Sequence, residues 1–465
     1  MKRIAIIGGG LSGLSAAYQL AQESIDFTLF EASGRLGGIV ETVQRDGFVI
    51  ECGPDSWVTE KPWARQLAIE LGLENEMIGS NDRWRRTYLL EGRHLIAMPD
   101  GMRMMVPTQW APVLNSPLFS WQARLGYLRE IRRATELKES SLGDGDDESV
   151  SGFVRRHFGD EVAQTIAGPL LAGVFGGSVD TLSVRAVMPG FVKLEREHGS
   201  LIAGLQQRQA TSSDSVFTSL KSGLETLIRR MTDTLPRESV RLSHEVRSIR
   251  REGSQWIIDA NGFTSQYGVL IVATPAHISR HLLSTIHEQF DSLLAMAATS
   301  AIVVALAFSA EPANRLRIPR GFGYLVPQRT SEPAKNQFSQ LLACTFVDQK
   351  FNHRAPQGAV LLRAFFGGDT APLLMQESDE ALVTLALQRL SQVLGPLSEP
   401  SIALVRRWPL SLPQYAVGHL DRMARLAELT ASLPSLHLIG NAYHGVGLPD
   451  LIREGRDAAR RIAQS

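Results

Sequence analysis

The stretch Ile4-Ala5-Ile6-Ile7-Gly8-Gly9-Gly10-Leu11-Ser12-Gly13 decides the fold of this chain. Its four leading apolar residues predict a strand buried on both faces, and the glycines that follow have the GxGxxG spacing. Residues 14–22 then have helical character. We expect the glycines to permit a tight turn, close approach of the backbone to a pyrophosphate, and close packing of helix and strand.

An acidic residue completes this motif at the end of the next predicted strand. Phe27-Thr28-Leu29-Phe30 reads as that strand, and Glu31 follows it, 18 residues after Gly13. An acidic side chain at this place accepts hydrogen bonds from ribose hydroxyls and would repel the additional phosphate of NADP. The order strand, glycines, helix, strand and acid therefore predicts a dinucleotide-binding domain for NAD or FAD.

The next residues favour FAD. Residues 31–38, Glu-Ala-Ser-Gly-Arg-Leu-Gly-Gly, resemble the R-x-G-G segment of the amine-oxidase-like FAD superfamily. Gly37 and Gly38 let backbone amides lie close to a ligand, and Arg35 can neutralise phosphate charge. Many members carry a basic residue directly after the two glycines. Ile39 stands there instead, which weakens an amine-oxidase assignment more than a flavin assignment.

Later segments fit the same cofactor. Residues 48–56 read as a strand entering a Gly-Pro turn, which resembles the family's second flavin-contacting loop, and residues 436–448 read as a strand followed by glycines and a helix start at Pro449. We expect the N-terminus of this last helix to face the flavin and to stabilise negative charge on its reduced form. The binding is expected to be non-covalent. The predicted cofactor-binding residues are Gly8, Gly9, Gly10, Leu11, Ser12, Gly13, Glu31, Ala32, Arg35, Gly37, Gly38, Ile39, Gly53, Pro54, Asp55, Ser56, Val246, Trp408, Asn441, Val446, Gly447 and Leu448.

Because these segments lie far apart, the sequence predicts an α/β fold with a discontinuous Rossmann-type FAD-binding domain. It comprises residues 1–82, 213–275 and 433–465, with a hairpin turn at Asn261-Gly262. Residues 83–212 are expected to form a mainly helical insertion for substrate or membrane contact. Its predicted helices span 121–137, 149–157 and 160–166, with Ser149 and Asp160 as N-caps. Residues 276–432 are expected to form a sheet-based substrate domain with strands at 301–308, 341–346 and 360–366 and a helix at 377–394.

Four segments resemble the porphyrinogen oxidases: residues 168–183, 220–224, 413–419 and 440–447. Across essentially the whole chain, the sequence is similar to oxygen-dependent protoporphyrinogen oxidases and to bacterial relatives that oxidise coproporphyrinogen III. The resemblance implies a six-electron oxidation of a tetrapyrrole substrate in haem biosynthesis, with dioxygen as acceptor and hydrogen peroxide as product. In that reaction flavin N5 carries the chemistry, so no protein residue is predicted to be catalytic.

Other interpretations stay open at this point. The chain also fits an amine-oxidase- or carotenoid-desaturase-like flavoenzyme, or a non-enzymatic prenyl-binding protein on the same fold. Coproporphyrinogen carries four propionates and protoporphyrinogen two, and either is a possible substrate. A ferrochelatase-type partner leaves no signal in the sequence. His277 and His281 have helical spacing but no third ligand, so no metal site is predicted.

Composition limits the possible partners and cellular location of the protein. Lys+Arg and Asp+Glu both number 48, so net charge is zero and nothing favours nucleic acid. Two distant cysteines, Cys52 and Cys344, fit a cytoplasmic protein, and no apolar run is long enough to span a membrane. Residues 83–133 nevertheless hold nine arginines against three acidic residues. That segment is a candidate for peripheral membrane contact, for substrate propionates, or for a solvated basic face.

Overall fold

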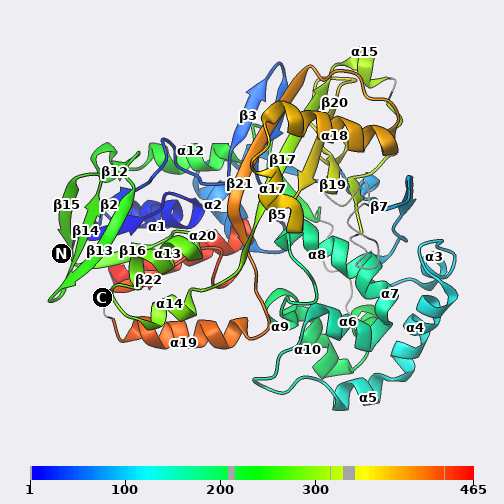
Figure 1. The fold of residues 1–465 in the computed structure, drawn as a ribbon, viewed down its shortest axis with the longest axis horizontal. Coiled ribbons are helices and arrows are strands. Elements are labelled where there is room, and N and C mark those ends of the chain that lie inside the picture. The colour runs from blue at the N-terminus through cyan, green and yellow to red at the C-terminus, as the bar shows by residue number, and fades with distance from the viewer. Residues whose placement is uncertain (1–2, 208–214, 315, 328–340, 434, 465) are drawn as a thin grey trace.

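The computed structural model describes residues 3–207, 215–314, 316–327, 341–433 and 435–464. A parallel five-stranded sheet of order β12-β2-β1-β16-β22 lies at the centre of the left half in Figure 1. Its strands are β1 (Ile4–Ile7), β2 (Phe27–Phe30), β12 (Val240–Arg241), β16 (Val269–Val272) and β22 (Leu436–Leu438). The apolar run that the sequence analysis singled out is the middle strand of this sheet.

Helices cover one face of the sheet. They are α1 (Leu11–Gln22), α2 (Pro62–Glu70), α12 (Glu225–Asp233) and α20 (Leu448–Ala463). Helices α1 and α20 pack side by side, and a Cβ added to Gly455 would lie 2.2 Å from the carbonyl oxygen of Ser12. The first and last helices of the chain therefore meet because Gly455 has no side chain.

An antiparallel sheet and three helices cover the other face. The sheet runs β13 (Val246–Glu252), β14 (Gln255–Ala260) and β15 (Phe263–Tyr267), and the helices are α13 (Ala276–Leu283), α14 (Gln289–Leu293) and α19 (His419–Ala431). The predicted hairpin is confirmed, since Asn261 and Gly262 have φ of 45° and 80° between β14 and β15. These are the values that the left-handed positions of a type I′ turn require.

The right half of Figure 1 holds a seven-stranded sheet of order β21-β17-β20-β19-β18-β7-β8. Helix α18 (Asp379–Leu394) packs on one face, and the side chain of Ser378 caps it by accepting from Ala381 N–H. The strands are β7 (Thr87–Glu91), β8 (His94–Ala97), β17 (Ala298–Phe308), β18 (Gly323–Leu325), β19 (Leu341–Phe346), β20 (Val360–Phe366) and β21 (Ile402–Pro413). Strands β7 and β8 come from residues that the sequence analysis placed in the mainly helical insertion.

The helices of that insertion lie at the lower right of Figure 1. They are α3 (Trp110–Leu114), α4 (Trp121–Arg132), α5 (Ala134–Glu139), α6 (Val150–Phe158), α7 (Asp160–Val162), α8 (Gly168–Phe175), α9 (Val184–Val187), α10 (Pro189–His198) and α11 (Leu201–Gln207). The predicted helix at 121–137 is two helices, which meet at Arg133. The predicted helix at 160–166 continues as a π-helical turn at Ala163–Ala167 into α8.

One of the two predicted N-caps is confirmed and the other is wrong. The Ser149 hydroxyl accepts from Gly152 N–H at 3.1 Å. At the start of α7, however, Gly159 is the N-cap, with φ of 93°, and Asp160 is the first helical residue. The carboxylate of Asp160 lies 2.5 Å from Arg155 Nε, so an ion pair holds it outside the helix end.

A buried histidine joins three helices of the insertion. His157 on α6 lies with Nδ1 3.1 Å from Glu130 of α4 and Nε2 3.0 Å from Glu195 of α10. All three side chains are fully buried. Buried carboxylates of this kind favour the charged imidazolium, which is the form that can donate from both ring nitrogens.

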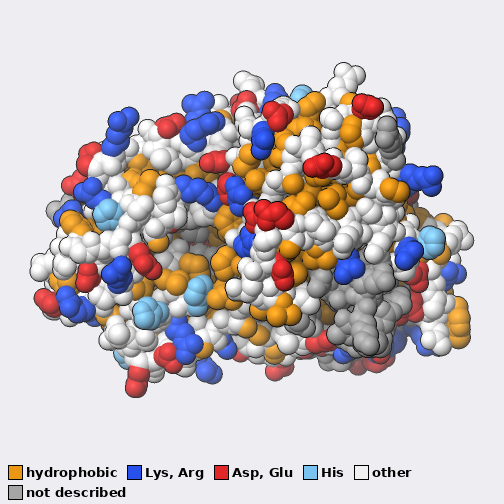
Figure 2. Space-filling model, turned by 45° about the horizontal axis from the view of Figure 1, so that its top comes forward, with side chains coloured by type: hydrophobic (Ala, Val, Ile, Leu, Met, Phe, Trp, Pro, Cys, Tyr) orange, Lys and Arg blue, Asp and Glu red, His pale blue; other side chains and the backbone are white. Residues whose placement is uncertain are grey.

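Three small sheets connect these parts. They are β3 (Thr42–Arg45) with β4 (Phe48–Glu51), β5 (Trp57–Val58) with β11 (Phe217–Leu220) and β6 (Met77–Gly79), and β9 (Met102–Arg103) with β10 (Val106–Pro107). Figure 2 shows hydrophobic side chains gathered on the right-hand half of the face turned to the viewer, with charged side chains around them. Within the described part of the chain, no helix is both long enough and apolar enough to cross a bilayer.

Candidate functional site

The glycine turn after β1 is open where a phosphate would lie. A Cβ added to Gly13 would lie 2.0 Å from the carbonyl oxygen of Gly8, so α1 packs tightly against the turn. A Cβ added to Gly10, by contrast, would meet nothing within 4 Å. Helix α1 begins directly after Gly10 without a side-chain cap, and the buried Ser12 hydroxyl has no partner among the described residues. The first amides of α1 and this hydroxyl fit a pyrophosphate.

Glu31 lies against the same turn. One carboxylate oxygen accepts from Gly9 N–H at 2.7 Å and the other from Ser33 N–H at 2.8 Å. The neighbouring Ala32 is exposed. The acid at the end of β2 is thus fixed beside the glycine turn, at the place predicted for a ribose.

The R-x-G-G segment closes over the glycine turn. Gly37 N–H donates to the carbonyl oxygen of Gly9 at 2.8 Å, and Gly38 has φ of 59°. The Arg35 guanidinium donates to the carbonyl oxygens of Leu36, Gly38 and Val40 at 3.3, 2.5 and 3.1 Å. Arg35 was expected to neutralise phosphate. In the structure, its donors shape the loop that carries the two glycines.

The Gly-Pro turn and a tryptophan from β21 meet beside this loop. A Cβ added to Gly53 would lie 1.9 Å from the carbonyl oxygen of Ile39, so the two segments are in contact. Trp408 Nε1 donates to the carbonyl oxygen of Cys52 at 2.8 Å, and the Arg35 guanidinium lies 6.0 Å from the Trp408 ring centre. Pro54 and Ser56 are half-buried. Ile39, Gly53 and Trp408, distant in sequence, therefore lie together.

The N-terminus of α20 forms the last part of the site. Gly447 precedes α20 without a side-chain cap, between the half-buried Val446 and the buried Leu448. Asp450 in its first turn is buried and lies 2.6 Å from Lys61 Nζ. The ion pair connects the chain that follows the Gly-Pro turn to the final helix.

Tyr415 joins this helix start to the segments that carry the resemblance. Its hydroxyl donates to the carbonyl oxygen of Asn441 at 2.6 Å and accepts from Gly445 N–H at 2.9 Å. Its own carbonyl oxygen accepts from Ser183 N–H at 2.7 Å. Val417 N–H also donates to the carbonyl oxygen of Thr181 at 3.0 Å. The segments 168–183, 413–419 and 440–447 thus converge, although nothing in their spacing indicated that they would.

Val246 follows His244 by two residues, and His244 N–H donates to the carbonyl oxygen of Glu31 at 2.9 Å. Val246 is buried at the start of β13, in the core on the opposite face of the parallel sheet from α1. No group of His, Cys, Asp and Glu among the described residues, including His277 and His281, is arranged to hold a metal ion.

Four charged side chains that the sequence did not predict lie with Asp55 in a cluster behind the Gly-Pro turn: Glu51, Lys350, Arg354 and Arg363. Lys350 Nζ lies 2.9 and 3.0 Å from the two carboxylate oxygens of Asp55. Burial alone would raise the pKa of Asp55, but Lys350 and Arg363 outweigh it and hold that pKa below its usual range. Burial raises the pKa of Glu51 to about 7 despite the opposing effect of Arg354. The only signal in the sequence is an arginine within the otherwise apolar strand β20.

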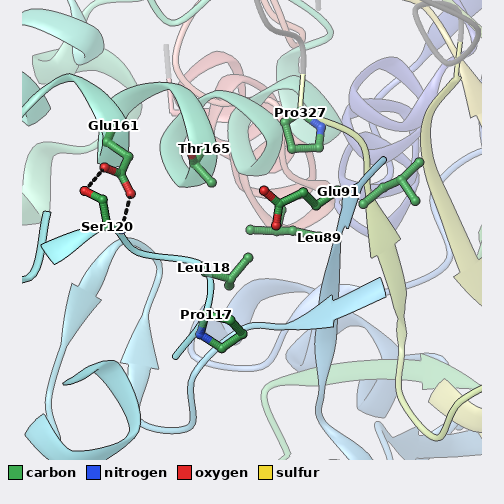
Figure 3. A pocket seen from close by; sticks show the side chains of 9 residues that line it. Leu89, Glu91, Pro117, Leu118, Ser120, Glu161, Thr165 and Pro327 are labelled. Carbon is green, nitrogen blue, oxygen red and sulfur yellow. Dashed lines mark hydrogen bonds between the residues drawn. The ribbon is translucent and has the colours of Figure 1, made fainter. Parts of the chain in front are cut away.

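A cavity of about 250 Å³ lies between β7 and the helical insertion (Figure 3). Figure 3 shows Leu89 and Glu91 of β7 on one side, and Glu161 and Thr165 on the other. The Glu161 carboxylate accepts from Ser120 N–H at 2.7 Å and from its hydroxyl, and so fixes the start of α4. The lining residues are Leu89, Leu90, Glu91, Pro117, Leu118, Ser120, Glu161, Thr165 and Pro327. No arginine is among the described residues that line it.

Comparisons with known proteins agree on one family. The family model described as flavin containing amine oxidoreductase matches residues 11–463. The chain is 33% identical to the coproporphyrinogen III oxidase of Bacillus subtilis (strain 168), over 98% of this chain and 97% of that protein. It is 31% identical to the coproporphyrinogen III oxidase of Staphylococcus aureus (strain NCTC 8325 / PS 47), over 99% of both. A solved structure from Exiguobacterium sp. 255-15, provisionally described as a protoporphyrinogen oxidase, is 32% identical with a TM-score of 0.85, covering 100% of this chain and 99% of that one.

Proposed function

Because the chain belongs to the flavin-containing amine oxidoreductase family, we propose that it is an FAD-dependent porphyrinogen oxidase of haem biosynthesis with coproporphyrinogen III as substrate. One observation carries this proposal. The likeness to coproporphyrinogen III oxidases extends over 98% of the chain, so it includes the helical insertion and the seven-stranded sheet as well as the nucleotide-binding sheet. Those two parts are where a substrate would be selected.

The residues brought together at the ends of β1, β2 and β4 and at the start of α20 fit FAD. We propose that the Gly8–Gly13 turn and the Ser12 hydroxyl hold its pyrophosphate and that Glu31 holds its ribose. Ile39, the Gly53–Ser56 turn and Trp408 then border its ring system, with the amides at the start of α20. Bound FAD supplies the acceptor for hydride from the porphyrinogen, and dioxygen regenerates it with release of hydrogen peroxide.

The chain's own residues position the two reactants. Gln414 Nε2 donates to the carbonyl oxygen of Phe175 at 2.5 Å, which fixes the end of α8 against the segment after β21. Val174 on the same helix is 50% exposed. We propose that this end of α8 offers an apolar surface to the macrocycle, close to the Tyr415-bonded start of α20.

The test is a side-by-side assay of purified, FAD-loaded protein with coproporphyrinogen III and protoporphyrinogen IX. We expect both to yield fluorescent porphyrin with consumption of dioxygen, with kcat/KM higher for coproporphyrinogen III. A higher kcat/KM for protoporphyrinogen IX would reverse the substrate assignment. Flavin-replete protein that oxidises neither substrate would refute the proposed function. Release of hydrogen peroxide with amines alone would then favour an amine oxidase.

We further propose that the exposed surface of α4 contacts membranes peripherally. Trp121 is 66% exposed, and Leu128, seven residues further along α4, is exposed on the same face. Arg129 and Arg132 are exposed beside them, whereas the acidic Glu130 is buried and paired. Exposed apolar side chains next to arginines favour an anionic lipid surface.

Vesicle flotation tests the membrane contact. We expect the protein to float with vesicles that contain anionic lipid and to remain in solution with zwitterionic ones. Trp121→Glu is expected to weaken the binding at least fivefold. Leu373→Glu is the matched control, because Leu373 is 73% exposed but lies on α17 (Ala371–Leu374), outside the helical insertion. Equal binding by both variants, or no binding by the parent protein, would rule out this surface.

A further inference from the structure

The buried charged cluster behind the Gly53–Ser56 turn carries an excess of positive charge. Asp55 is paired with Lys350 and lies 3.4 Å from Arg363 Nη1, and Glu51 lies 3.3 Å from Arg354 Nη2. None of these five side chains is more than 13% exposed. Three cations thus face two carboxylates, and water has little access to screen the difference.

Although each cation has an ion-pair partner, some of the arginine N–H groups have no hydrogen-bond acceptor. Arg354 Nε and Nη1 and Arg363 Nε are buried without an acceptor among the described residues. Burial of a cation is costly unless an opposite charge or an acceptor compensates it. A cluster built in this way therefore favours negative charge that appears nearby.

The cluster is attached directly to the turn that we propose borders the flavin ring. Arg363 donates to the carbonyl oxygen of Gly53, and Lys350 and Arg363 hold the side chain of Asp55. The Ser219 hydroxyl donates to the carbonyl oxygen of Asp55 at 2.7 Å and also accepts from Arg354 Nη2 at 2.6 Å. The cationic groups therefore cannot move independently of the turn.

We propose that Lys350, together with Arg354 and Arg363, raises the reduction potential of bound FAD by stabilising the negative charge of its reduced form. Lys350 is a positioning residue in this proposal, because it acts through the Gly53–Ser56 turn and not by contact with substrate. The inference rests on the proposed binding of FAD. It adds a second source of positive potential to the N-terminus of α20.

Two readouts on the FAD-loaded protein test the proposal: the midpoint potential and the affinity for sulfite. Sulfite adds to oxidised flavin and leaves negative charge on the ring, so nearby positive charge tightens its binding. We expect Lys350→Met to weaken sulfite binding about tenfold and to lower the midpoint potential by about 30 mV, the equivalent for a two-electron couple. Asp55→Asn removes a negative charge instead, so it should tighten sulfite binding and raise the midpoint potential.

The double variant and a surface control separate electrostatics from structure. Lys350→Met with Asp55→Asn restores the net charge, so its sulfite affinity should return to within about twofold of the parent protein's and its midpoint potential to within about 10 mV. Arg280→Met removes a cation from an exposed pair with Asp291 and should change neither readout. A purely structural clamp would lower the melting temperature of both single variants without opposite shifts in potential.

Three results would overturn the inference: single variants that shift the potential in the same direction, single variants with unchanged potentials, or a double variant shifted as far as Lys350→Met. If Lys350→Met does not fold, Asp55→Asn decides alone, and an unchanged potential overturns the inference. A parent protein that takes up no FAD refutes the proposed function instead. If the parent protein oxidises porphyrinogen and the variants have the same midpoint potential as the parent, only the proposed role of the cluster is refuted.

Discussion

Replacing Tyr415 with phenylalanine removes one oxygen atom that joins two segments of the site. The hydroxyl lies between Asn441, whose carbonyl oxygen it reaches at 2.6 Å, and Gly445, whose N–H it accepts at 2.9 Å. Both partners belong to the chain that leads into α20. The ring of Tyr415 is buried, with 3% exposure, so water cannot easily replace the hydroxyl.

The expected loss of stability follows from these two bonds. A buried donor or acceptor left without a partner costs about 1–3 kcal/mol, so two such groups predict a loss of about 2–6 kcal/mol. Because Asn441 and Gly445 are only half-buried, we expect the lower part of this range, about 2–4 kcal/mol. The start of α20 also loses the contact that fixes Gly445 just before it. Because this helix start is proposed to face the flavin, FAD affinity should fall together with stability.

Urea unfolding with and without FAD measures both effects, and fluorescence quenching of FAD gives its Kd. Tyr267→Phe is the matched control, because Tyr267 is fully buried and its hydroxyl has no partner among the described residues. That variant should be as stable as the parent or slightly more stable. If Tyr415→Phe unfolds within about 0.5 kcal/mol of the parent and binds FAD equally well, the reasoning is wrong.

Two further substitutions test the local structure. Gly13→Ala should prevent FAD uptake, because the added Cβ would lie 2.0 Å from the carbonyl oxygen of Gly8. Flavin absorbance per protein measures the uptake. Gly34→Ala is the control and should retain the cofactor, because a Cβ there meets nothing within 4 Å. His157 tests pH dependence: burial lowers its pKa, but its two carboxylate partners outweigh burial and raise it. The stabilisation is therefore complete below the unfolded-state pKa of about 6.5 and is lost as pH rises through the higher folded-state value. Urea unfolding between about pH 6 and pH 9 should show this decline in the parent and not in His157→Gln; an equal slope in both would contradict it.

Short sequence motifs predicted much of the fold. The run Ile4–Ile7 and the glycines after it predicted the central strand and α1 because strand, turn and helix depend on neighbouring residues. The Asn261-Gly262 hairpin and the Ser149 cap followed from the same short-range chemistry. Asp160 was misassigned by one position: Gly159 is the N-cap, and the Asp160 carboxylate pairs with Arg155 and does not cap the helix.

Strand partners were less predictable. Residues 87–97 lie within a segment whose helices dominate, yet they form the edge of the seven-stranded sheet because β7 pairs in parallel with β18. That pairing joins residues more than two hundred positions apart. A periodicity of two residues marks a strand but does not say which sheet it joins.

The sequence by itself determined the nucleotide-binding motif, the identity of the cofactor and, through four segments, the family. Each rests on residues that act within a few positions of one another. Only the tertiary structure placed Lys350 against Asp55, 295 positions away, and Tyr415 between Asn441 and Gly445. The physical reason is burial. On a surface, water solvates a lone charge or hydroxyl. Once the fold buries the group, its contribution to stability depends on the distant residue that pairs with it.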